Sequence, residues 1–104
     1  MMNIKELKLI IAEGEGYSTE FKENADKSLA KELVAFSNSS GGKILLGVSD
    51  DGELRGIKIT NRIKSFILDL ARNCDPPLVL QLFSVGNILI IDVPEGKHKP
   101  YQCK

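Results

Sequence analysis

The spacing of apolar residues predicts three helices. The first follows Asn3, which forms a capping-box pattern with Glu6 three residues later, and it ends at Gly14. Its apolar positions repeat every three or four residues: Ile4, Leu7, Ile10 and Ile11. The second is expected between Asp26, a favoured N-cap residue type, and the polar, glycine-rich run at 37–42. Its apolar stripe consists of Leu29, Leu33 and Phe36.

A third helix is expected between Thr60, another N-cap residue type, and Asp75-Pro76-Pro77, which cannot continue a helix. Strands are predicted at 17–22, 43–48, 54–59, 78–85 and 87–93. Turn residues at 50–52 and 86–87 predict hairpins between the second and third and between the fourth and fifth strands. This order favours an α+β fold, a two-layer α/β sandwich in which helices pack on one face of a mostly antiparallel sheet.

The composition fits one globular domain. A chain of 104 residues is long enough for one hydrophobic core. Its 14 basic and 14 acidic residues cancel, so any contact with nucleic acid must come from a local patch. No apolar stretch or leader suggests a membrane or export, and a cytoplasmic protein is expected. The run 97–104 lacks a turn signal or polar tail, which predicts a longer protein with a downstream domain.

Several chemistries have no support in the sequence. Cys74 and Cys103 lie 29 positions apart without metal-ligand spacing, which favours two reduced thiols over a zinc site or a disulfide framework. His98 is the single histidine and argues against a catalytic triad. The Ser39–Lys43 segment closes a helix, whereas a phosphate-binding loop opens one. Asn38 is interpreted as a hydrogen-bonding group at a helix end.

Three carboxylates and a lysine are candidates for a catalytic site. Alternation along the first strand places Glu20 and Lys22 on one face, Glu15 precedes them, and Asp50 follows a later strand. Glu15, Glu20 and Asp50 would suit Mg²⁺ or Mn²⁺, which can activate water against a phosphodiester, with Lys22 neutralising developing charge. The alternative is that these side chains are simply solvated.

Basic residues form two groups that could contact phosphate, in addition to Lys22. The first consists of Arg62, Lys64 and Arg72 around the third predicted helix, and the second of Lys97 and Lys99 near the end of the chain. The same pattern is also typical of the solvated face of an amphipathic helix and of a solvated loop.

Six motifs taken together carry a family resemblance. They are Glu15, Glu20-Phe21-Lys22, Ala35-Phe36-Ser37-Asn38 running into Gly41-Gly42, the run 47–52, Val93-Pro94-Glu95-Gly96, and Pro100-Tyr101. In this order they resemble the Schlafen/AlbA-type domain. That domain implies a two-layer α/β DNA-binding module, found in bacterial and archaeal transcriptional regulators beside winged-helix or divergent AAA-type ATPase segments.

The resemblance also implies a possible enzyme. In animal Schlafen proteins the same positions form a metal-dependent RNA-cleaving centre, which would carry over to Glu15, Glu20 and Asp50 with Lys22 alongside. Gly16 replaces the serine and Ser37 the alanine that are common in the family, and neither replacement removes a ligand. The animal enzymes clamp RNA between two lobes, so this chain would need a homodimer or its downstream domain.

Three functions follow as hypotheses, in this order. The first is a module that binds DNA or RNA within a regulator, the second is a metal-dependent nuclease, and the third is a domain that only assembles a larger protein.

Overall fold

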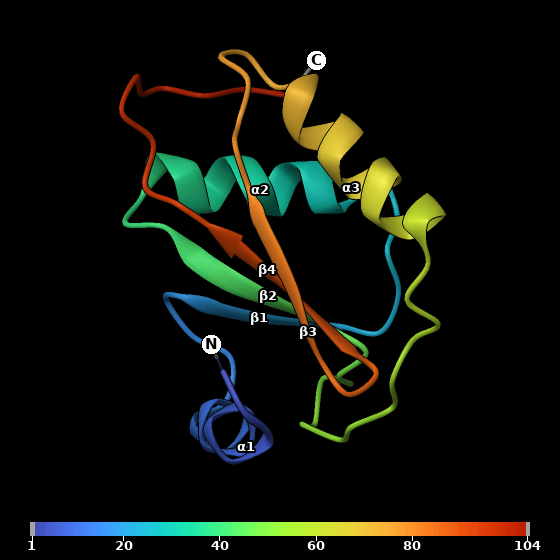
Figure 1. Ribbon diagram of the computed structural model, residues 1–104. Helices are drawn as coiled ribbons and strands as arrows, with labels where there is room; N and C mark the ends of the chain where they lie inside the picture. The colour runs from blue at the N-terminus through green and yellow to red at the C-terminus, as the bar shows by residue number, and fades with distance from the viewer. Residues whose placement is uncertain (1, 104) are drawn as a thin grey trace.

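Seven elements of secondary structure are seen in the computed structural model, which describes residues 2–103 (Figure 1). They are α1 (Ile4–Glu13), β1 (Thr19–Lys22), α2 (Leu29–Asn38), β2 (Gly42–Leu46), α3 (Asn61–Arg72), β3 (Gln81–Val85) and β4 (Ile88–Val93). The sheet order is β1-β2-β4-β3, with β1 parallel to β2 and the other two pairs antiparallel. The predicted α+β class and the mostly antiparallel sheet are therefore confirmed.

Side-chain caps begin two of the helices, as the sequence predicts. The Asn3 side chain accepts a hydrogen bond from the Glu6 amide at 2.9 Å, and the Thr60 hydroxyl accepts one from the Ile63 amide at 3.1 Å. Each bond satisfies an amide that the first turn of a helix leaves unpaired. Within residues 2–103 the longest helix, α3, has 12 residues, and no helix has the length and apolar character to cross a membrane.

The predicted cap of α2 is wrong by two residues. Ser28 occupies the N-cap position and makes no side-chain capping bond. The Asp26 carboxylate instead accepts a hydrogen bond from the Ser28 amide at 2.9 Å and another from its hydroxyl. Asp26 thus closes a turn just before the helix, a use of aspartate that competes with capping.

Two apolar clusters lie on opposite faces of the sheet. Ile44 and Leu46 of β2 pack with α2 and α3, whereas Leu45 between them packs with Leu7 of α1. Because β4 is buried along nearly all its length, both faces of the sheet need a covering layer. The prediction of helices on one face holds for α2 and α3, and α1 covers the other face (Figure 1).

The return strand predicted at 54–59 does not form. A single bridge joins Val48 to Leu54, and beyond it the Ile57 amide donates to the carbonyl of Asn87 at 2.9 Å, in the turn between β3 and β4. The reason lies in the sheet order, because β1 and β4 already occupy both edges of β2. A hairpin partner therefore has no free edge to join.

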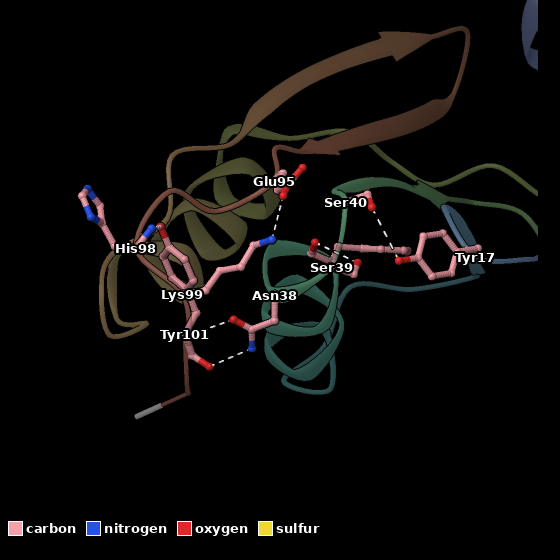
Figure 2. A network of polar contacts seen from close by, with 9 residues as sticks. Tyr17, Asn38, Ser39, Ser40, Glu95, His98, Lys99 and Tyr101 are labelled. Atoms are coloured by element: carbon pink, nitrogen blue, oxygen red, sulfur yellow. Dashed lines mark hydrogen bonds and ion pairs between the residues drawn. The ribbon is translucent and has the colours of Figure 1, made fainter.

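The segment after β4 is tied to the end of α2 through Asn38. Its side chain accepts a hydrogen bond from the Tyr101 amide at 2.6 Å and donates one to the Tyr101 carbonyl at 3.0 Å (Figure 2). The interpretation of Asn38 as a group that hydrogen-bonds a helix end is therefore wrong, because both of its partners belong to Tyr101. A further antiparallel bridge joins Asp75 to Gln102, so the segment is held at two points.

Candidate functional site

The alternation along β1 brings charged side chains against α2. Phe21 packs in the α1 cluster, so its neighbours Glu20 and Lys22 face the opposite side of the sheet. There Lys22 meets Glu32, in the first turn of α2, with 3.0 Å between the ammonium nitrogen and a carboxylate oxygen. We call Glu15, Glu20, Lys22 and Glu32 the carboxylate–lysine cluster.

Glu20 is the most perturbed member of this cluster. Burial, the hydrogen bond and charge of Glu15, and then the charge and hydrogen bond of Glu32 raise the pKa of Glu20 to about 7. Each of these effects disfavours a third negative charge in the same space. Near neutral pH, Glu20 is therefore protonated in part of the molecules.

Lys22 is engaged inside the cluster. Its ammonium group donates to the Ser28 hydroxyl at 2.8 Å as well as to Glu32. Burial alone would lower the pKa of Lys22, but the hydrogen bond and charge of Glu32, with the charges of Asp26 and Glu20, raise it overall. The other carboxylate oxygen of Glu32 is buried without a partner in the described residues. Lys22 is thus a fixed positive charge beside two glutamates.

The structure places Asp50 apart from these contacts. Asp50 is exposed in the turn after β2 and is not among the groups that raise the pKa of Glu20. The turn lies against α1, where a Cβ added to Gly52 would be 3.3 Å from Ile11. Asp51 accepts a hydrogen bond from the Ser49 hydroxyl, as befits its predicted role in the turn.

The contacts in the cluster therefore differ from the predicted trio of ligands. Glu15 and Glu20 lie within hydrogen-bonding reach of each other, and Glu32 takes the third place, which no motif in the sequence predicts. In residues 2–103, no group of three or more aspartate, glutamate, histidine or cysteine side chains is arranged to hold a metal ion. Glu15 and Glu20 are the oxygen donors that would fit a divalent cation.

The predicted basic residues divide by their partners. Arg72 pairs with Asp69, and Lys99 pairs with Glu95 at 2.7 Å. The other three residues are exposed and make no ion pair within residues 2–103: Arg62, Lys64 and Lys97. An ion pair on the surface offsets the charge of its cation. The three unpaired cations are therefore better placed than Arg72 and Lys99 to attract a phosphate.

Lys27, a basic residue that the sequence did not single out, lies near the same aromatic ring as Arg62. Lys27 and Phe66 line a groove of about 310 Å³ between α2 and α3, which we call the α2–α3 groove. Its lining residues are Lys27, Ala30, Phe66, Leu70, Asn73, Cys74 and Cys103. Arg62 and Phe66 line an adjacent hollow of about 190 Å³. The half-buried Phe66 ring is thus shared by two hollows, and each of them is lined by one cation.

Another hollow, of about 480 Å³, lies at the start of β2. Its lining includes the Ser40–Lys43 segment, but Lys43 is paired with Asp92 at 3.3 Å. The Ser40 hydroxyl lies 3.5 Å from that of Tyr17 (Figure 2). With its lysine engaged and Glu13 and Glu95 also in the lining, this hollow does not favour a phosphate.

Comparison with known proteins decides the family. The family model described as Schlafen, AlbA_2 matches residues 15–104, most of the chain. The chain belongs to this family. The match begins at Glu15, so it includes the whole carboxylate–lysine cluster and both helices of the α2–α3 groove, whereas α1 precedes it. The predicted Schlafen/AlbA resemblance is confirmed.

A solved structure shows the same fold for this Schlafen, AlbA_2 domain. The crystal structure of the DIP2311 protein from Corynebacterium diphtheriae superimposes with a TM-score of 0.61 at 18% sequence identity. The match covers 96% of this chain and 23% of that one, so this chain spans about a quarter of the length of DIP2311. At this identity the likeness concerns the fold alone. No curated protein matches the chain in sequence.

The perturbed carboxyl makes stability depend on pH. Because the folded-state pKa of Glu20 is about 7 against 4.5 ordinarily, the folded state holds its proton more tightly, and stability falls as pH rises between these values. Glu20→Gln removes this loss. We expect it to raise the unfolding free energy at pH 8 by about 1 kcal/mol, since partial exposure screens the effect, and to change nothing at pH 4.

Urea denaturation at pH 4, 6 and 8 measures this difference. Glu23→Gln removes the same charge from an exposed position just beyond β1 and serves as the control. An equal gain in both variants would mean that general charge, and not the cluster, sets the pH dependence.

Proposed function

We propose that this Schlafen, AlbA_2 domain binds DNA or RNA through the surface around the α2–α3 groove. The observation that carries the proposal is the placement of Lys27 and Arg62 in two hollows that share Phe66, with no ion-pair partner for either cation in residues 2–103. Free cations contact phosphates, and an aromatic ring in the same hollows offers a stacking surface for a base.

The neutral net charge shapes the expected binding. A chain with 14 basic and 14 acidic residues has no overall attraction for nucleic acid, so affinity depends on a few local contacts. Binding is then weak and falls steeply with salt, in proportion to the number of phosphates contacted. Lys64, on the same helix as Arg62, and Lys97 would add contacts, whereas Lys22, Arg72 and Lys99 are held by acidic partners.

Fluorescence anisotropy with labelled single-stranded DNA and tRNA at low salt tests this proposal. The double variant Lys27→Gln/Arg62→Gln is expected to bind roughly tenfold more weakly and with a shallower salt dependence, because two phosphate contacts are lost. Lys5→Gln/Lys8→Gln makes the same charge change on α1, across the sheet, and should bind like the unaltered protein. An equal loss in the two doubles, or none in either, would refute the surface.

A metal-dependent nuclease is the second candidate, favoured by the contact between Glu15 and Glu20. Two neighbouring carboxyl groups, of which Glu20 has a pKa of about 7, are also a suitable pair for one Mg²⁺ or Mn²⁺ ion. A bound ion would activate water and offset charge on the phosphoryl group. Lys22 would remain a fixed positive charge beside it, while Asp50 would need to approach from its exposed turn.

The same nucleic acids, incubated with Mn²⁺ or with chelator and run on gels, separate the two candidates. Cleavage that requires Mn²⁺ and is lost in Glu20→Ala supports the nuclease, and cleavage that survives in chelator excludes it. A shift without cleavage supports binding alone. If neither a shift nor cleavage occurs, the assembly hypothesis remains. Sedimentation would then show whether the domain forms a homodimer.

A further inference from the structure

The fold brings the two cysteines together although they lie 29 positions apart. Asp75 and Gln102 exchange two backbone hydrogen bonds, of 2.9 and 3.0 Å, in an antiparallel bridge. The next pair of residues in this register is Cys74 and Cys103. Residues opposite each other beside such a pair have Cα atoms about 4.5 Å apart, within the range that a disulfide spans.

The side chains of the two cysteines also share a surface. Both line the α2–α3 groove, as residues on the same face of an antiparallel pair do. Cys74 is buried, and its thiol donates to the carbonyl of Leu70 at 3.4 Å, whereas Cys103 is exposed. Burial and the proximity of Cys103 raise the pKa of the Cys74 thiol. Both thiols are free in the structure, and an exposed thiol stands beside a buried one.

We propose that Cys74 and Cys103 form a reversible disulfide by exchange with a small-molecule disulfide such as oxidised glutathione. The exposed Cys103 thiolate attacks one sulfur of the oxidant, forming a mixed disulfide and releasing one glutathione thiolate. Cys74 then loses its proton and attacks the Cys103 sulfur, which releases the second glutathione. The two protein thiols give up two protons and two electrons, and the oxidant is reduced to two thiols.

The bond would join the end of α3 to the last described segment of the chain. It would fix the wall of the α2–α3 groove next to Lys27 and Phe66. The cross-link also encloses β3 and β4, and so limits the freedom of the unfolded chain. The oxidised form should therefore be more stable than the reduced one.

Titration of the whole 104-residue chain with mixtures of reduced and oxidised glutathione tests the proposal. Mass spectrometry should show the loss of two hydrogens without dimerisation, and peptide mapping should join Cys74 to Cys103. The equilibrium constant against glutathione should be at least about tenfold larger in buffer than in concentrated urea, because the fold holds the thiols opposite each other. The oxidised protein should melt at least roughly 5 °C higher.

Two variants complete the test. Cys74→Ala should stop at the Cys103–glutathione adduct, and Cys103→Ser should leave Cys74 unmodified in the folded state. The proposal is overturned if the unaltered protein accumulates the adduct or a Cys103-linked dimer while Cys74 stays free. Equal equilibrium constants in buffer and in urea would overturn it as well, without depending on the folding of either variant.

Discussion

Gly41→Ala is expected to lower the free energy of unfolding by about 3 kcal/mol, the sum of a backbone and a packing cost. Gly41 follows α2 with φ at +85°, a conformation that favours glycine. A Cβ here would lie 2.7 Å from the Val93 carbonyl oxygen and 2.9 Å from the Glu95 nitrogen. Both neighbours are backbone atoms at the end of β4, so relief requires movement of a central strand.

Gly14→Ala is the matched control for this change. Gly14 has nearly the same dihedral, φ +83°, but a Cβ there would meet nothing within 4 Å. Its ψ of 178° completes a backbone conformation that essentially only glycine adopts, so the cost should be the backbone strain alone, about 2 kcal/mol. Urea denaturation of both variants separates the two contributions. Equal losses would show that the chain after β4 can move away from Gly41 without cost.

Asn38→Ala is expected to cost about 2 kcal/mol, because two hydrogen bonds to the Tyr101 backbone are lost and their partners are left without a replacement. Tyr101 is itself buried, and its hydroxyl accepts a bond from the His98 amide at 3.2 Å (Figure 2). Amide hydrogen exchange should therefore accelerate throughout 96–102, while the helices remain protected.

Asn73→Ala provides the comparison, since Asn73 also ends a helix but makes no side-chain hydrogen bond within residues 2–103. Its effect on unfolding should be a few tenths of a kcal/mol at most, as for other exposed substitutions. A similar cost at both positions would mean that helix termination, and not attachment of the last segment, explains the loss at Asn38.

Elements whose determinants lie close together in sequence were predicted well. The caps at Asn3 and Thr60 act within three residues, and the periodicity that follows each of them marks its helix. The return strand at 54–59 was mispredicted because its local signals are strong, whereas the contacts that exclude it involve residues far away in the sequence. These contacts are the pairing of β2 with both β1 and β4, which cannot be inferred from neighbouring residues alone.

The candidate site was likewise predicted where nearby residues determine it and missed where distant contacts do. Alternation along β1 predicted that Glu20 and Lys22 share a face. Glu32 and Lys27 were missed, because their roles depend on how α2 crosses back over β1 and packs beside α3. The proximity of Cys74 and Cys103 depends likewise on a bridge between residues 27 positions apart, Asp75 and Gln102.

The position of β1 has a consequence for solubility. β1 is an outer strand of the sheet, with β2 as its neighbour on one side, and such a strand can recruit a strand from another molecule. Its four-residue length and its charges at Glu20 and Lys22 oppose that association. Removing a charge from β1 therefore weakens a barrier to aggregation, and Glu20 variants should be compared with the unaltered protein at matched monomer concentration.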